Sequence, residues 1–367
     1  MHKRIAFIAL LWVIPMLLHG QTSYLNRPDL LEKVKECLQN TYNFSFDEAR
    51  QIQQQLELET PEHPAPYFLE ALILYWENFP LIPEDRASSR FVDLMDHSVE
   101  LAGTFLEDNS NYLEGVFFDL FGRAFKAMFW ADNGRAAKLI PDLATMYRQT
   151  REGFELKDQF PEFYFSTGLY NYYIEAYPEA HPAYKPLVAF MQGGDKKLGL
   201  QQLNYAINHA IYLKVESILF MSLIQLKYEE DLNSAFLYAQ KLYDSYPRNS
   251  YYQGHLITIL LYLNRFSQVE EVLTAMKDQH DDYSEMIRSM AHAYLEEKET
   301  GNLRKAELEY EKTIGYATGF GSITDAFTAI GYMGLSRIAA SKGNDREASD
   351  HARKAAKYTN YSFILGE

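Results

Sequence analysis

The sequence predicts an all-α protein, built as an α-solenoid of about eight antiparallel helix pairs, because glycine and proline divide it into about sixteen helical segments. A second observation is that the period-2 alternation typical of β-strands is nearly absent. A third is a recurring helix end: twelve residues separate the small Ala49 from Pro61, and the same interval separates Ala235 from Pro247. Recurring ends of this kind indicate structural repeats.

The clearest unit runs from residue 193 to residue 249, where the sequence alternates between helix and turn signals. Its last helix, SAFLYAQKLYDSYPRN, places Ala235, Ala239 and Leu242 on one face. Small residues on that face allow a neighbouring helix to approach closely. Pro247 ends the helix because it has no backbone N–H to continue the hydrogen-bond ladder.

This unit resembles the tetratricopeptide repeat family, whose helix pairs of about 34 residues have small residues at the crossing and a proline at the closing turn. Exported bacterial members of that family often carry a similar GGD turn followed by a helix that begins like KKLGLQQL, which here starts at Gly193. The resemblance covers Leu30 to Thr359 and is strongest from Gly193 onward, although the signature tryptophan of the family is missing from every unit. It implies a right-handed superhelix.

The N-terminal part, residues 21–192, is expected to hold divergent repeats. The segments expected to be helical are Asp29–Tyr42, Asp47–Leu58, Tyr67–Phe79, a helix from Glu84 or Ser88 to about Glu107, the phenylalanine-rich YLEGVFFDLFGRAFKAMFW after Asn111, a helix through Tyr147, and FYFSTGLYNYYIEAYP. Gly168 is the small residue at the crossing in the last of these. A proline-rich insertion is expected near residues 177–192, since Pro182 and Pro186 precede a double glycine.

Residues 193–359 are expected to hold more regular repeats, with a short tail over residues 360–367. The expected helices are one that begins at KKLGLQQL, then Val215–Tyr228, Leu232–Tyr246, Tyr251–Leu263, Phe266–Lys277, two in SEMIRSMAHAYLEEKETGNLRKAELEYEKTI, and two in the stretch from TDAFTAIGYM to KYTN. Ala291 and Ala306 are the small residues expected at the crossing of the penultimate pair.

The chain begins with the pattern of a secretory signal peptide over residues 1–20. Lys3 and Arg4 precede an apolar run from residue 5 to residue 18, and the small Gly20 follows. That run is too short to span a bilayer comfortably, so cleavage after Gly20 is expected rather than an uncleaved anchor. No cysteine follows the run, which argues against a lipid anchor. The mature protein is therefore expected in the periplasm or outside the cell, without an integral membrane segment.

The composition excludes two kinds of partner. Acidic residues number 50 against 35 basic ones, which gives a net charge of −15. A chain this acidic is not expected to bind nucleic acid, which needs basic patches against the phosphates, and it would be repelled by an anionic membrane surface. Cys37 is the single cysteine, so no intramolecular disulfide forms, and its spacing with Leu30, Val34 and Leu38 indicates a buried thiol.

Motifs for catalysis, metal binding and cofactor binding are not found. GGDKKLG lacks the end of a phosphate-binding loop, and Asp195 as a helix N-cap explains it better. No HExxH zinc motif and no GxSxG nucleophile turn occurs. His97 and Glu100 share a helix face but form only a pair, which we interpret as solvated. No cofactor, no metal and no enzymatic activity are therefore expected.

Candidate ligand-binding residues lie beside the predicted packed stripes. Arg288 and His292 share a face that would line the concave surface in the tetratricopeptide family, and Tyr251, Thr258 and Lys227 take similar places in the two preceding units. A cationic strip of this kind in an acidic protein would suit an acidic peptide or a C-terminal carboxylate. The lysine and asparagine set of the chaperone-binding members is not reproduced.

A second candidate surface is the aromatic region around Phe118 and Tyr172, where an apolar peptide or a sugar ring could stack. The function expected from the whole sequence is that of an exported non-enzymatic scaffold that binds a protein or peptide in the cell envelope. The alternative is a cell-envelope binding protein for a glycan or other small nutrient, of helical-repeat type. Such receptors are usually lipid-anchored, and the missing anchor cysteine counts against this alternative.

Overall fold

The computed structural model describes residues 23–366, so the predicted signal peptide at residues 1–20 lies outside the described residues. All regular structure in the described range is helical, which confirms the all-α prediction. Two α-helices have only four residues, α8 (Lys185–Val188) and α18 (Ser362–Leu365). The other sixteen described α-helices have ten residues or more, which matches the number of helical segments predicted from the sequence.

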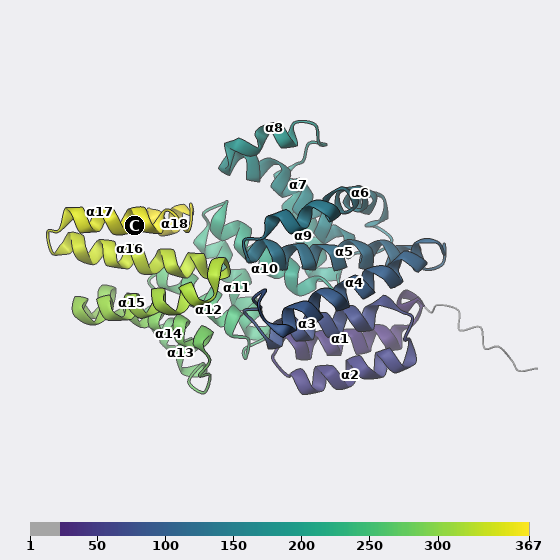
Figure 1. Ribbon diagram of the computed structural model, residues 1–367, viewed down its shortest axis with the longest axis horizontal. Coiled ribbons are helices and arrows are strands. Elements are labelled where there is room, and N and C mark those ends of the chain that lie inside the picture. Colours follow the sequence, from purple (N-terminus) through teal and green to yellow (C-terminus); the bar gives the residue numbers. More distant parts are fainter. Residues whose placement is uncertain (1–22, 367) are drawn as a thin grey trace, which may run out of the picture.

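These sixteen helices follow one another along the chain (Figure 1). They are α1 (Pro28–Tyr42), α2 (Phe46–Glu59), α3 (Pro64–Glu77), α4 (Arg86–Leu106), α5 (Tyr112–Asp132), α6 (Ile140–Leu156), α7 (Phe163–Ala180), α9 (Lys196–His209), α10 (Lys214–Lys227), α11 (Leu232–Ser245), α12 (Ser250–Tyr262), α13 (Phe266–Ala275), α14 (Asp282–Leu295), α15 (Leu303–Gly319), α16 (Asp325–Ser341) and α17 (Asp345–Ala355).

Neighbours in sequence pack together in space. The pairs in contact are α1 with α2, α3 with α4, α5 with α6, α7 with α9, α10 with α11, α12 with α13, α14 with α15, and α16 with α17. At both ends of the chain alternate helices also touch, as in α1 with α3 and α14 with α16. The arrangement is therefore that of a helical-repeat-like all-α protein.

Two boundaries differ from the prediction. The insertion expected from residue 177 begins later, because α7 continues to Ala180 with Pro178 inside its last turns, where a proline removes only one hydrogen bond. The segment that follows contains α8, which packs on α7 and stands apart from the other helices in Figure 1. The tail predicted at residues 360–367 contains α18, which packs on α10 and α16.

The small residues predicted at helix crossings are buried. Ala235 and Ala239 of α11 have no exposed surface, and neither have Ala291 and Ala306. Both α2 and α11 end two residues before the proline of the recurring interval. Cys37 is also fully buried, and burial raises the pKa of its thiol to about 12.

The first repeat-like pair lies against the middle of the chain. The Asn249 side-chain amide donates to the Tyr42 carbonyl oxygen at 3.0 Å, although the two residues are 207 positions apart. The Tyr42 ring lies 5.7 Å from the Tyr246 ring, and the Trp76 ring lies 5.9 Å from that of Tyr251, measured between ring centroids. These contacts join α1–α3 to α11 and α12, so the inner faces of distant helices enclose a shared interior.

Within residues 23–366, none of the helices combines the length and the apolar character needed to cross a bilayer.

The crossing of α7 and α9 leaves no room for a side chain at Gly199. A Cβ atom there would lie 2.8 Å from the Gly168 carbonyl oxygen and 2.8 Å from the Tyr172 amide nitrogen, both backbone atoms. We therefore expect Gly199→Ala to lower the free energy of unfolding by about 1 to 3 kcal/mol. Chemical denaturation monitored by circular dichroism would measure the change.

Gly315→Ala is the matched control, because Gly315 lies on the exposed face of α15 with open space around its Cβ position. Alanine is favoured over glycine in a helix, so this variant should gain about 0.4 to 1 kcal/mol. Equal effects of the two substitutions would contradict the close approach of α7 and α9.

Candidate functional site

The interior between the distant helices contains a cavity of about 390 Å³, here named the central cavity. Its walls come from α3, α5, α7, α10, α12 and the C-terminal segment. The lining residues are mostly aromatic: Tyr75, Trp76, Phe79, Phe125, Met128, Asp132, Tyr173, Tyr177, Glu216, Leu219, Phe220, Leu223, Lys227, Tyr228, Tyr251, Tyr252, Ile323 and Tyr361. Its volume falls in the range of roughly 300–1,000 Å³ that is usual for small-molecule sites.

One face of α10 runs along the cavity. Glu216, Leu219, Phe220, Leu223 and Lys227 all line it, and their spacing of three and four residues places them on a single stripe of the helix. Glu216 lies in the first turn and Lys227 in the last. The stripe therefore carries a carboxyl group at one end, an ammonium group at the other and apolar side chains between them.

A buried carboxylate fixes the start of α10. Glu162 accepts hydrogen bonds from the amides of Ile211, Tyr212 and Leu213, the last two at 3.1 and 2.9 Å. Burial raises the pKa of Glu162 to about 7, and the three amide bonds act in the opposite direction because they stabilise the anion. Leu213 is the N-cap residue of α10 and the other two residues precede it, so these bonds satisfy amides that lie before the helical hydrogen-bond ladder.

Tyr42 and Glu216 meet at the N-terminal end of the stripe. The Tyr42 hydroxyl donates to Glu216 Oε1, and the buried Glu216 Oε2 has no hydrogen-bond partner among residues 23–366. Burial raises the pKa of Glu216 to about 7. A carboxyl group with this pKa is partly protonated at neutral pH, which lowers the cost of its burial.

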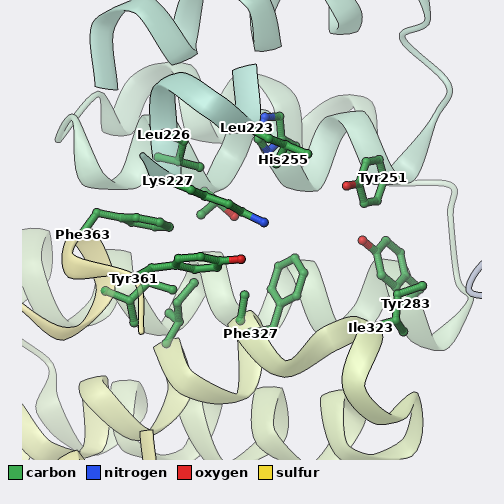
Figure 2. A pocket seen from close by; sticks show the side chains of 14 residues that line it. Leu223, Leu226, Lys227, Tyr251, His255, Tyr283, Ile323, Phe327, Tyr361 and Phe363 are labelled. Carbon is green, nitrogen blue, oxygen red and sulfur yellow. The ribbon is translucent and has the colours of Figure 1, made fainter. Parts of the chain in front are cut away.

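A smaller pocket of about 120 Å³ adjoins the central cavity at Lys227, and Figure 2 shows it. Lys227, Leu223, Tyr251, Ile323 and Tyr361 line both spaces. The rest of the smaller pocket is formed by Leu226, His255, Thr258, Tyr283, Ala326, Phe327, Ile330, Phe363 and Ile364.

The Lys227 ammonium group projects between the two walls of this pocket. Its nitrogen lies 4.6 Å from the centroid of the Tyr361 ring, a cation–π contact. In Figure 2 the ammonium group and the Tyr361 hydroxyl point in the same direction into the open space. Lys227 also lines a third, more polar pocket of about 320 Å³ beside Glu179 and Glu230. It is therefore the cation common to all three spaces.

His255 is held neutral beside this lysine. Burial lowers the pKa of His255 to about 3, and the Lys227 charge acts in the same direction. Its Nε2 lies 2.8 Å from the Ser222 hydroxyl, which itself donates to the Ala235 carbonyl oxygen. Because the hydroxyl has one hydrogen, it must accept from His255, and Nε2 carries the imidazole proton.

Asp132 of α5 brings a carboxyl group to the central cavity. It is the last residue of α5, and its backbone carbonyl oxygen accepts from the Ser322 hydroxyl at 2.7 Å. Burial raises the pKa of Asp132 to about 6, while the positive charge of Lys227 lowers it. The two groups therefore interact electrostatically, yet no ion pair joins them within residues 23–366.

The structure brings three of the predicted strip residues together. Lys227, Tyr251 and Thr258 all line the smaller pocket. The Thr258 hydroxyl donates to the Gly254 carbonyl oxygen at 2.8 Å, so its hydrogen is already engaged inside α12. Lys227 and Tyr251 are thus the members of the strip whose polar groups can face a ligand.

Arg288 and His292 lie elsewhere, and Arg288 is not the free groove cation that the sequence suggested. Its guanidinium donates to the carbonyl oxygens of Met276 and Gln279 and pairs with Glu285. These carbonyls follow α13, so Arg288 ties the end of one helix to the next. His292 is exposed on α14 and lines none of the three pockets described above.

The two aromatic candidates, Phe118 and Tyr172, are buried in the packed interior. Phe118 has no exposed surface, and its ring packs against Phe68, Phe117 and Tyr212, so it offers no face to a ligand. Tyr172 is buried as well, and its hydroxyl bonds to Glu229. Periodicity could not separate these buried rings from the rings that line the cavity, because both kinds lie on apolar helix faces.

The sequence pattern does not predict a site role for the cavity residues Trp76, Asp132, His255 and Tyr361. Tyr361 belongs to a segment that is expected to be only a tail. One signal was present: Glu216 and Lys227 are charged positions on the apolar stripe of α10, and ionisable groups on such a stripe are rarely buried without a partner or a function.

Metal-binding geometry is not found in the described part of the chain, where no group of three or more His, Cys, Asp or Glu side chains could hold an ion. His97 and Glu100 form the exposed pair that their spacing predicted, with 3.4 Å between Nδ1 and Oε2.

Comparison with known proteins finds no protein-family model that matches the chain and no significantly similar curated protein.

Replacement of Arg288 should affect stability, because its guanidinium is only 15% exposed and satisfies two backbone carbonyls. We expect Arg288→Ala to lower the free energy of unfolding by about 1.5 to 3 kcal/mol. Arg353→Ala is the control: this side chain is 74% exposed and pairs with Asp350 one helix turn away, so its loss should change the free energy of unfolding by less than about 0.5 kcal/mol. Denaturant titration of both variants measures the difference, and equal midpoints would show that the carbonyl bonds contribute nothing.

Proposed function

We propose that this protein is a non-enzymatic binding protein that holds a compact ligand with an apolar or aromatic face in the central cavity. The observation that carries this conclusion is the cavity wall itself. Ring side chains such as Trp76, Tyr251 and Tyr252 surround a space of small-molecule size, and a few ionisable groups converge on it. An apolar pocket with few convergent polar groups is the usual form of a small-molecule site.

The fold that supports this function is proposed to be a right-handed tetratricopeptide-like α-solenoid. Successive helix pairs with small crossing residues support it, as does the GGD turn. Asp195 of that turn caps α9 by accepting the Leu198 amide hydrogen at 2.9 Å. The contacts of α1–α3 with α11 and α12 are additional to what a linear stack of repeats needs.

The cellular location is proposed from the sequence alone. The basic and apolar order of residues 1–20 favours export to the periplasm or beyond, with removal of that segment. A small-molecule binding protein of the cell envelope, the alternative reading of the sequence, fits the aromatic cavity better than a scaffold for a folded protein does. Aromatic rings that stack on a sugar or another ring would give such a ligand most of its contact area.

A second candidate function, recognition of a short peptide, has its own support. The C-terminal segment already lies on the inner face as an added piece of chain: Ser362 bonds to Glu230, and the Phe363 ring lies 5.1 Å from that of Tyr262. A surface that accepts this aromatic segment could accept a similar peptide from a partner protein in its place.

Filling the central cavity should abolish binding of a small ligand. Leu223 lines both the central cavity and the smaller pocket, so Leu223→Trp places an indole in the ligand space. Calorimetry against mono- and disaccharides, aromatic acids and amino acids should identify a ligand for the wild type. Affinity for that ligand should fall about ten-fold or more in the variant, which corresponds to about 1.4 kcal/mol.

Leu237→Trp provides the matched control, because Leu237 is 65% exposed on α11 and lines none of the described pockets. It should bind as the wild type does. A ligand that binds Leu223→Trp and the wild type equally would place the site outside the central cavity.

Peptide recognition is tested by removing residues 361–367. If the inner face is a peptide site, the synthetic peptide YSFILGE should raise the melting midpoint of the shortened chain and leave that of the full chain unchanged, because the full chain already fills the site. A peptide in which Phe363 is replaced by Ala should act more weakly, since Phe363 packs on Tyr262. No response of the shortened chain to the peptide would refute this second function.

A further inference from the structure

We propose that the ligand of the central cavity is a zwitterion, an α-amino acid with an apolar or aromatic side chain, whose carboxylate binds Lys227 and whose ammonium group binds Asp132. This identification of the ligand class rests on the proposed function, and it is carried by two opposite charges that line one cavity without pairing with each other.

The first charge is the Lys227 ammonium group. It lines the central cavity, and its described contact is with the face of the Tyr361 ring rather than with a carboxylate. The neighbouring imidazole of His255 donates to Ser222 and is held neutral by burial, so it adds no second positive charge beside Lys227. Within the described part of the chain, this ammonium group forms no hydrogen bond or ion pair, so its three hydrogens can be donated to an anion in the cavity.

The second charge is the Asp132 carboxylate. It lines the same cavity from the end of α5, and its side-chain oxygens accept no hydrogen bond within residues 23–366. The bond that reaches this residue, from Ser322, ends on its backbone carbonyl oxygen. Burial without a hydrogen-bond donor raises its pKa to about 6, so the carboxylate would gain from a cationic partner.

The position of the two groups selects a ligand that carries both charges. Lys227 is close enough to influence Asp132, but the two do not form an ion pair. An anionic ligand alone would satisfy Lys227 and place a second negative charge near Asp132, and a cationic ligand alone would do the opposite. A zwitterion provides each group with a charge-assisted hydrogen bond of about 2.7 to 2.9 Å and adds no net charge to the cavity.

The remaining walls suit an apolar side chain. The cavity is also lined by Trp76, Phe79, Phe220 and Leu223. Tyr228 and Tyr251 line the same cavity as Lys227, and their hydroxyls could donate to a ligand carboxylate. An α-amino acid fits because its two charges are adjacent and its side chain extends away from both.

Three related ligands test whether the cavity needs both charges of a zwitterion or only an aromatic ring. L-phenylalanine, phenethylamine and 3-phenylpropionate share one ring and differ only in their charges. Calorimetry of the wild type at pH 7.5 should show L-phenylalanine binding about ten-fold or more tightly than either of the others. In Asp132→Asn, the affinity for L-phenylalanine should fall to that of the wild type for 3-phenylpropionate. In Lys227→Met, the affinity for L-phenylalanine should fall to that of the wild type for phenethylamine.

Lys342→Met is the control for the loss of a lysine, because this side chain is 49% exposed and pairs with Glu307 on the surface. It should bind all three ligands as the wild type does. The unliganded Lys227→Met and Asp132→Asn variants should melt close to the wild-type temperature, since both side chains are partly exposed and neither forms an ion pair within residues 23–366. That result would show that weaker binding does not come from unfolding.

Three other outcomes would contradict the inference that the ligand is a zwitterion. If the three ligands bind equally and Leu223→Trp blocks them all, the cavity is a ring-binding site, the proposed function stands, and the zwitterion inference fails. If none of the three binds while a sugar does, the inference also fails and the cavity takes a neutral ring. Tight binding of L-phenylalanine that is unchanged in Asp132→Asn would likewise refute it.

Discussion

The architecture of the interior depends on Tyr42, the residue that ends α1. Its hydroxyl bonds to Glu216 of α10, its carbonyl oxygen accepts from Asn249 beside α12, and its ring packs against Tyr246. The side chain and the backbone carbonyl of this fully buried residue thus join the first helix of the chain to the middle of the chain. The contact between the Trp76 ring of α3 and the Tyr251 ring of α12 encloses the same interior.

The cavity has one well-anchored wall, α10, and two charged groups, Asp132 and Lys227, that do not pair with each other. Glu162 holds the N-terminus of α10 through three amides, so the stripe from Glu216 to Lys227 is fixed in direction. Asp132 and Lys227 are then held near each other without an ion pair. Buried polar groups are usually satisfied within the protein, and unsatisfied ones occur where a ligand or catalysis needs them. Asp132 and Lys227 therefore have their positions set by α5 and α10 before a ligand binds.

The sequence was sufficient for the helices but not for the cavity. Punctuation by glycine and proline, and small residues such as Ala235, are local signals, and they located the helices and their crossings. Which apolar face meets another helix and which meets a cavity is decided by contacts between distant residues, so Phe118 and Tyr251 looked alike in the sequence. Arg288 was predicted to line a ligand groove, but its partners are backbone carbonyls. The side-chain pattern of a sequence does not indicate such partners. Lys227 was predicted from its place in its unit, which corresponds to the face of Arg288 and His292 in a later unit.

The contacts between the first helices and the middle of the chain also bear on how this protein can change in evolution. In an open stack of repeats each unit touches only its neighbours, so units can be duplicated or lost with little consequence for the others. Here Tyr42 and Asn249 must meet across 207 positions. The gain or loss of one helix pair between them would rotate and displace one partner relative to the other. The number of units in this interval is therefore constrained, and relatives of this protein should vary in length outside it.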